Sequence, residues 1–213
     1  MKKKIVGIFM LCLVLTLAIS AQNKEIIPLS EPDRSGGMSL LEALSNRSSS
    51  RTFSAEALSE KHLSGLLWAA SGVNREDGRR TAPTARNWQQ IDIYLIMADG
   101  WDLYDHKEHA LIKQGADDFR EHAGSQDYVS TAPLNLIYVS DHDRMTGADE
   151  DNRKFHSATD VGFVSQNVYL YCASEEISTV VRGLLDRDKL HGLLKLGPSQ
   201  HVILGQTVGY PGQ

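Results

Sequence analysis

The chain has 213 residues, of which 41% are apolar and 23% charged, which is ordinary for a globular protein with one sizeable core. Its formal net charge at pH 7 is −5, from 22 lysines and arginines against 27 aspartates and glutamates. An acidic chain is a poor partner for nucleic acid or for an anionic membrane surface. The sequence also lacks the internal repeats that would indicate a solenoid.

The first 21 residues have the pattern of a secretory signal peptide. Three lysines at positions 2–4 precede an apolar run over residues 5–19, and small residues follow at plausible cleavage positions. Cleavage is expected after Ser20 or Ala21, with an uncleaved anchor as the alternative, although the run is short for a membrane span. Cleavage leaves 22 − 3 = 19 cations against 27 anions, a net charge of −8. The mature protein is therefore expected in the periplasm or otherwise outside the bacterial cytoplasm, where its single cysteine, Cys172, cannot form an intrachain disulfide.

Residues 22–38 are polar and contain two prolines and a glycine pair, which predicts a linker or an extended arm before the main domain at 39–213. Ser39 is a good N-cap for a short helix over residues 40–44. The helix is followed by Arg47, Ser49 and Arg51, with further hydroxyl groups between them. Two arginines and several hydroxyls supply charge-assisted donors in a small space, which suits a phosphate; an exposed polar loop is the alternative.

The stretch 72–90 is the longest segment without helical or strand periodicity. It follows a predicted helix, capped by Ser59, that runs to residue 71 and ends at Gly72. It contains Pro83 and Asn87 and four arginines. A segment of this length inside a compact domain is usually functional or disordered, and the apolar elements on both sides favour a functional loop that forms one wall of a cofactor pocket.

The remaining elements alternate between strands and helices. Strands are predicted at the following ranges: 91–98, 101–104 after an Asp99-Gly100 hairpin turn, 134–140, 178–183 and 201–208. Helices are predicted in part of 110–122, and over 152–174 and 186–196. The small and apolar face of the 152–174 helix suits close packing, either within one subunit or across a subunit boundary. The pattern predicts an α+β domain with a central antiparallel or mixed sheet.

Few catalytic signatures are present. His106 and His109 lie three residues apart, but no carboxylate or cysteine stands at ligand spacing, so a metal site is not expected. The sequence contains no GxGxxG turn, P-loop, HExxH or GxSxG motif. A site whose reactive atoms belong to a bound cofactor fits the remaining arginine, serine and amide groups best.

Several motifs, in order, resemble the nitroreductase family of flavoproteins. They cover residues 39–211 and are RxSxRxF at 47–53, LLWAAxGVNR at 66–75, TAPTAxNxQ at 81–89, TVVRG at 179–183 and GYP at 209–211. The 80–85 segment and the GYP ending look most like the branch near the SagB-type dehydrogenases of azoline-forming toxin maturation.

The resemblance implies a nitroreductase-like α+β fold, with a mostly antiparallel central sheet flanked by helices, in an interlocked homodimer with one FMN per subunit at the interface. It assigns the FMN phosphate and ribityl chain to Arg47, Ser49 and Arg51, and the isoalloxazine to Pro83, Thr84 and Asn87, with Gln89 as a weaker assignment. Gly183 and the backbone near Arg182 would approach the reactive edge of the ring. Arg79 or Arg80 would reach the cofactor or substrate.

The implied activity is an oxidoreductase that works by a ping-pong mechanism on a small organic acceptor, such as a nitro compound or a quinone, with the redox chemistry on the flavin and no obligatory catalytic side chain. The resemblance implies NAD(P)H as the usual electron donor, but an exported protein would meet little NAD(P)H outside the cytoplasm, so another reductant is an open alternative. A basic pair that many members carry beyond the last strand does not occur up to Gln213, so Arg47 and Arg51 would carry more of the phosphate charge. The alternatives are a SagB-like dehydrogenase, an electron-relay protein and a flavin-free scaffold.

Overall fold

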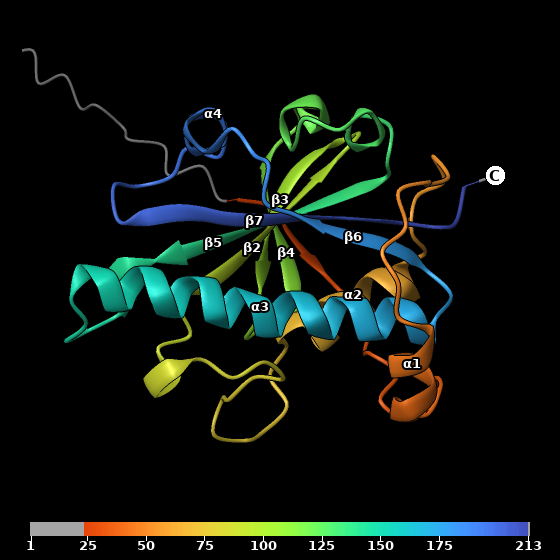
Figure 1. Ribbon diagram of the computed structural model, residues 1–213, viewed down its shortest axis with the longest axis horizontal. Coiled ribbons are helices and arrows are strands. Elements are labelled where there is room, and N and C mark those ends of the chain that lie inside the picture. The colour runs from red at the N-terminus through yellow and green to blue at the C-terminus, as the bar shows by residue number, and fades with distance from the viewer. Residues whose placement is uncertain (1–23, 213) are drawn as a thin grey trace, which may run out of the picture.

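The computed structural model in Figure 1 describes residues 24–212. The predicted signal peptide and its cleavage site lie outside these residues. Within the described part, no helix combines the length and apolar character that crossing a bilayer requires.

A seven-stranded sheet in which every pairing is antiparallel forms the centre of the molecule, in the order β1-β4-β3-β2-β5-β7-β6. The strands are β1 (Ile26–Pro28), β2 (Ile91–Met97), β3 (Gly100–Asp105), β4 (Ala110–Gly115), β5 (Leu134–Asp141), β6 (Ser178–Arg182) and β7 (Gln200–Gly209). The α+β prediction with a mostly antiparallel sheet is confirmed. β5 is almost wholly buried and β7 is buried over its second half, whereas β6 leaves one edge of the sheet open to other contacts.

Four α-helices flank the sheet, and three of them lie on one face (Figure 1). They are α1 (Leu40–Asn46), α2 (Glu60–Ser71), α3 (Glu150–Ser174) and, on the opposite face, α4 (Arg187–Leu193). Their starts follow from local capping: Ser39 and Glu42 form a reciprocal capping box on α1, and Asp149 caps α3 by accepting from the Asn152 N–H at 2.8 Å.

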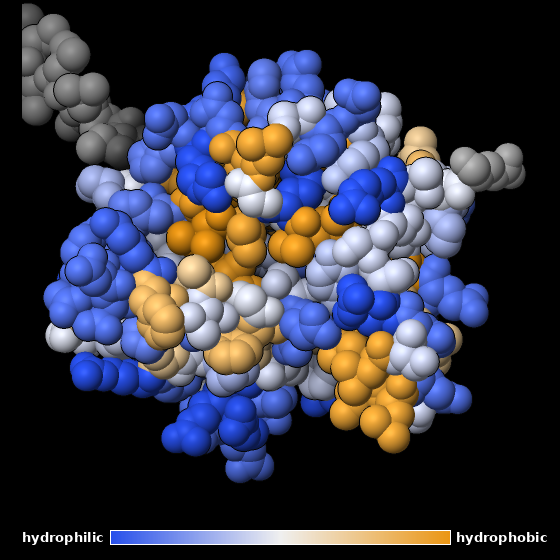
Figure 2. All heavy atoms as spheres, viewed as in Figure 1, coloured by the Kyte–Doolittle hydropathy of each residue, from blue (hydrophilic) through white to orange (hydrophobic). Residues whose placement is uncertain are grey.

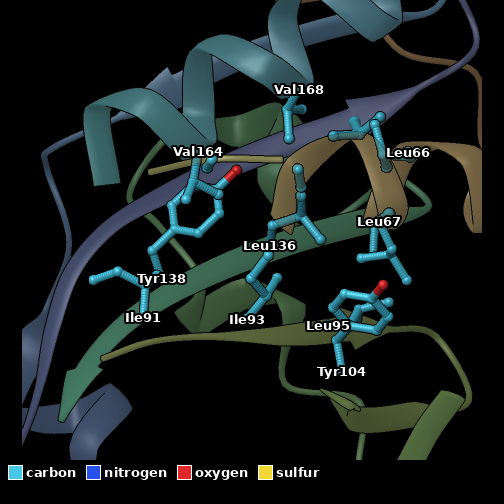
Figure 3. Packing of buried hydrophobic residues seen from close by; sticks show 14 of the residues in the cluster. Leu66, Leu67, Ile91, Ile93, Leu95, Tyr104, Leu136, Tyr138, Val164 and Val168 are labelled. Atoms are coloured by element: carbon cyan, nitrogen blue, oxygen red, sulfur yellow. The ribbon is translucent and has the colours of Figure 1, made fainter. Parts of the chain in front are cut away.

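Each face of the sheet has its own hydrophobic core. The larger core lies between the sheet and helices α2 and α3; Figure 3 shows Leu66 and Leu67 of α2 and Val164 and Val168 of α3 directed toward the strands. The second core lies under α4 and the 119–129 segment and includes Leu190. The central strands β2 and β5 are therefore buried on both faces, which explains why their sequences are mostly apolar along their whole length.

Three local predictions need correction. Residues 110–122 are not partly α-helical: they form β4 and a 3₁₀ turn at Arg120–His122, because pairing with β3 and β1 outweighs local helix preference. The hairpin turn consists of residues 98–99, and Gly100, with φ +132°, already pairs with Met97. Gly72 ends α2 in an extended conformation (φ −71°); its missing side chain makes room for Trp68, since a Cβ would lie 2.4 Å from the Trp68 Cδ1.

The predicted arm contains β1, which forms the outer strand of the sheet. Beyond β1, the Leu29 N–H donates to the His109 carbonyl at 3.1 Å, and the Met38 N–H donates to the Ser174 Oγ at 2.8 Å. The arm therefore crosses from the β4 edge to the C-terminal end of α3 and joins the domain at α1.

Candidate functional site

Tyr169 of α3 connects residues 47–51, the arginine–serine loop, to the open edge of β6. Its hydroxyl lies 2.8 Å from the Ser49 Oγ and accepts a hydrogen bond from the Val181 N–H at 2.9 Å. The Arg47 guanidinium lies 5.3 Å from the centroid of the Tyr169 ring. The Ser50 N–H also donates to the Thr179 carbonyl at 3.0 Å. The loop is thus fixed beside β6, and Arg51 stays exposed.

The loop and the end of β6 are a few residues apart along the strand. At about 3.3 Å per residue, Gly183 lies roughly 13 Å beyond Thr179. Gly183 is exposed, and a Cβ added to it would meet only the Leu204 Cδ2, at 3.8 Å. Its carbonyl accepts from the Arg187 Nη2 at 3.2 Å. The strand therefore ends in an exposed stretch of backbone at Gly183, called the cradle below, and the Arg187 side chain holds this backbone in place.

The Arg182 side chain lies on the inner side of this strand end. It is 4% exposed, and its guanidinium donates to the Ala123 carbonyl at 2.6 Å and to the Asn135 Oδ1 at 3.0 Å. Burial lowers the Arg182 pKa to about 10, so the group remains charged at neutral pH. Only the Arg182 backbone, which was the part expected at the reactive edge, faces the cradle.

The 72–90 loop has two parts. The first is a small hairpin in which Val73 pairs with Arg80 and the Asn74 N–H donates to the Arg79 carbonyl. Arg79 is exposed beside Asp77, whereas Arg80 is half-buried with its Nη1 3.4 Å from the Ile91 carbonyl. Burial lowers the Arg80 pKa to about 10.

The second part, residues 83–90, is conformationally strained. Arg86, Asn87 and Gln89 have φ values of 50°, 54° and 51°, a left-handed conformation that non-glycine residues seldom adopt. Thr84 holds the turn, because its carbonyl accepts from the Asn87 N–H and its Oγ1 accepts from the Gln89 N–H at 2.9 Å. Pro83 and Asn87 are exposed. Strained backbone of this kind, with several left-handed non-glycine residues close together, is typical of ligand-binding loops.

Asp160 of α3 fastens both ends of this strained loop. It is 2% exposed, and its Oδ2 accepts from the Ala85 N–H at 3.1 Å and from the Gln90 Nε2 at 2.8 Å. Sequence reasoning missed both Asp160 and Tyr169, because each stands in the middle of a helix that otherwise reads as core.

The two candidate binding segments lie on opposite sides of α3. Asp160 and Tyr169 are nine residues apart, which is two and a half helical turns, so their side chains leave opposite faces about 13 Å apart along the axis. In Figure 1 the yellow loop lies on one side of α3 and β6 on the other. Within one chain, residues 47–51 lie along the strand that leads to Gly183, whereas residues 83–89 lie on the other side of α3.

The remaining candidates lie elsewhere. His106 is buried with its Nδ1 3.0 Å from the Ser71 carbonyl, and His109 lies between the Tyr104 hydroxyl and the Ser64 Oγ, each at 2.8 Å. Within residues 24–212, no group of three or more His, Cys, Asp or Glu side chains is placed to hold a metal ion. Cys172 is buried and free, and burial raises its thiol pKa.

Two hollows flank α3 near its C-terminal end. The larger, of about 660 Å³, lies between the arm, α1, α2 and α3. The smaller, of about 310 Å³, borders Ser48 and Ser50 on the other side of the arginine–serine loop. Arg47, Ser49, Arg51 and residues 83–89 line neither hollow, and Ser49, Arg51, Pro83 and Asn87 are exposed on the surface of the single chain.

The family model described as the nitroreductase family matches residues 44–210. The chain belongs to the nitroreductase family. A protein of Methanocaldococcus jannaschii, provisionally named a nitroreductase, is 28% identical over 180 residues, which is 80% of this chain and 90% of the relative. This places the arginine–serine loop, the strained loop and the β6 end inside the matched region.

Solved structures agree with the family assignment. A provisionally named nitroreductase from Ralstonia eutropha JMP134 is 42% identical, with a TM-score of 0.84 over 88% of this chain and 90% of that one. The NADPH:FMN oxidoreductase of Vibrio harveyi, solved with NAD⁺, has a TM-score of 0.62 at 21% identity, covering 82% of this chain and 69% of that one. The second likeness is one of fold.

Proposed function

We propose that this chain is an FMN-dependent oxidoreductase. The observation that carries the proposal is the Arg47–Ser49–Tyr169–Val181 connection, which fixes a cationic, hydroxyl-rich loop about 13 Å from an open glycine backbone along one strand edge. An extended ribityl phosphate with a flat ring can cover that span, with its dianionic phosphate at the arginines.

Each group has a defined task toward FMN. Arg47 and Arg51 neutralise the phosphate, and the Ser49 hydroxyl supplies a further hydrogen bond. Gly183 leaves room for the ring, since a Cβ there would occupy the space that is now open. Bound FMN would supply the two-electron redox chemistry, which is why no side-chain acid or base is required.

We propose that the site is completed by a second copy. Residues 83–89, with Thr84, Asn87 and Gln89 as polar groups, cannot reach Gly183 of their own chain, but a homodimer brings them to the partner's flavin. Figure 2 shows an orange patch over α1 and a paler one toward the other end of α3. The exposed apolar residues here are Leu40, Leu41, Leu44, Phe155 and Phe163. Apolar surface of this kind on one face favours self-association.

We further propose export through residues 1–21 and, with it, a reductant other than cytoplasmic NAD(P)H. Donor and acceptor, the latter a nitro compound, a quinone or a similar small molecule, would occupy the same position in turn, as in ping-pong kinetics. A SagB-like dehydrogenase acting on an azoline is the alternative substrate class. Anaerobic reduction of the bound flavin by NADH, NADPH or a quinol, followed by steady-state kinetics, separates these donors and separates an enzyme from an electron relay.

The cofactor assignment is tested with the mature protein from Gln22 onward. FMN should co-purify, and added FMN should raise the melting temperature, because a ligand bound only by the folded state stabilises it. Arg47→Ala with Arg51→Ala should weaken FMN binding by at least about a hundredfold, since two charge-assisted contacts are lost. A Lys107→Ala/Lys189→Ala variant, which removes two cations outside the site, is the matched control. A colourless protein that FMN does not stabilise would refute the oxidoreductase proposal.

Complementation tests the shared site. Chains with both arginine substitutions are mixed, by unfolding and refolding together, with chains that carry Thr84→Ala and Asn87→Ala. If each site uses residues 47–51 of one copy and 83–89 of the other, about a quarter of the sites become intact in the mixture. Absence of any recovery in a dimeric mixture would place both loops' contributions within one chain.

A further inference from the structure

Arg182 is a buried cation, unpaired with any carboxylate of residues 24–212, at the end of the strand that leads to Gly183. It is 4% exposed, and the two oxygens that accept from it, the Ala123 carbonyl and the Asn135 Oδ1, are both neutral. Among the described residues, no Asp or Glu pairs with it, and its Nε is buried without a partner. A buried guanidinium normally has a carboxylate partner, because an unpaired charge in the interior is costly.

The surrounding backbone is built to accommodate this guanidinium. A Cβ on Gly124 would lie 1.9 Å from the Arg182 Nη1, and a Cβ on Gly205 would lie 3.2 Å from the Nη2. Asn135 is oriented by its own bonds: its Nδ2 donates to the Val129 carbonyl at 2.9 Å, and its Oδ1 also accepts from the Thr207 Oγ1 at 2.7 Å. Several elements therefore fix the position of the Arg182 guanidinium, and none of the groups that contact it carries a negative charge.

The unpaired charge lies close to the proposed ring site. The guanidinium is about 6 Å from its own Cα, and the Gly183 Cα is 3.8 Å further along the chain, so a ring in contact with Gly183 is roughly 12 Å away. At that distance, and with an effective dielectric constant of about 20, one unit charge changes a charge-forming equilibrium by roughly tenfold. Arg182 itself is 4% exposed, so solvent screens its charge less than that of a surface arginine.

We propose that Arg182 tunes the bound flavin by raising its reduction potential through the field of its uncompensated charge. This inference rests on the proposed FMN site. Two-electron reduction by an external donor takes FMN, two electrons and one proton to a reduced flavin with one negative charge on the ring, and that charge is what Arg182 stabilises. Arg182 does not touch the flavin; it acts through the field across the strand, so it is a tuning residue and not a catalytic one.

A purely structural role of Arg182 predicts a different pattern of effects on the flavin. Arg182 also joins β6 to the 119–131 segment through the Ala123 carbonyl, so its removal lowers stability whatever its effect on the flavin. Arg120 offers a matched comparison: it lies in the same segment and its Nη1 donates to the Ala132 carbonyl just beyond the segment at 3.0 Å, but its charge is neutralised by Asp118 at 2.8 Å. Losing either arginine loosens the segment, and only loss of Arg182 removes an unpaired charge.

The test measures the midpoint potential of FMN in the holoprotein by anaerobic equilibration with a reference dye. Arg182→Gln should disfavour the reduced state by roughly tenfold, which is about 30 mV more negative for two electrons. Arg182→Lys, which keeps the charge, and Arg120→Gln should each stay within about threefold of wild type, or roughly 15 mV. Asn135→Asp, which pairs Arg182 without removing it, should shift the potential in the same direction as Arg182→Gln and serves if that variant does not fold.

Two results would overturn the inference. One is a potential unchanged in both Arg182→Gln and Asn135→Asp. The other is an equal shift in Arg182→Lys and Arg182→Gln, which would assign the effect to the hydrogen bonds and not to the charge. Wild-type protein that holds no FMN would instead refute the proposed function, and this inference with it, so the two failures are distinguishable.

Discussion

Replacing Tyr169 with Phe tests the connection on which the site depends. The substitution removes one oxygen atom and leaves the ring that stacks with Arg47 in place. It deprives the Val181 N–H of its acceptor at 2.9 Å and Ser49 of its partner at 2.8 Å. A buried donor left without a partner costs about 1–3 kcal/mol. Because Val181 is half-buried, water can replace part of the bond, and about 1–2 kcal/mol is expected.

The loss should appear in two measurements. For a chain of this size, about 1–2 kcal/mol lowers the melting temperature by roughly 3–6 °C. The arginine–serine loop is also less well ordered, so FMN binding, followed by quenching of flavin fluorescence, should weaken by about five- to tenfold. Tyr171→Phe is the matched control: its half-buried hydroxyl, two positions along α3, forms no hydrogen bond with any described residue. Wild-type stability and FMN affinity in Tyr169→Phe would refute the assigned role of the hydroxyl.

Three further changes test other parts of the site. Asp160→Leu should weaken FMN binding by about tenfold or more and lower the melting temperature, because the Ala85 N–H loses its acceptor. Asp160→Asn keeps an acceptor and should retain most of the affinity. FMN titration and thermal melts measure both effects. Gly183→Ala should leave the melting temperature of the apoprotein nearly unchanged, since a Cβ would meet only the Leu204 Cδ2 at an ordinary contact distance of 3.8 Å, yet weaken FMN binding by about tenfold, as titration would show. Burial and the nearby Arg80 hold the pKa of His106 well below 6.5, so the folded state binds fewer protons than the unfolded state below that pH and stability falls as pH falls. His106→Asn should therefore reduce the slope of unfolding free energy against pH as the pH falls below 6.5, toward a limit of about 1.4 kcal/mol per unit, measured by urea titration.

Each of these predictions has a result that contradicts it. Wild-type FMN affinity in Asp160→Leu would show that the Asp160 side chain does not position the strained loop. Unchanged affinity in Gly183→Ala would place the ring elsewhere. An unchanged pH slope in His106→Asn would mean that this imidazole is not held neutral by its surroundings.

Local chemistry made much of the fold predictable from the sequence. Ser39, Ser59 and Asp186 cap helices because a side-chain oxygen next to an apolar periodic run satisfies free backbone donors. The long apolar runs of β2 and β5 are strands because they are covered on both faces. The same approach failed for β4, whose strand state depends on partners 5–86 residues away in sequence.

The sequence by itself determined which residue types the site has: the arginine–serine loop, the aperiodic 72–90 segment and the glycine after 178–182 are all recognisable as motifs. Only the tertiary structure decided how they are held and where they meet. Tyr169 and Asp160 are the anchors, and no local pattern marks them, because their partners come from loops about 70–120 residues distant. Their separation by two and a half helical turns places the two binding segments on opposite sides of α3, and this geometry is a property of the folded helix that a list of motifs does not contain.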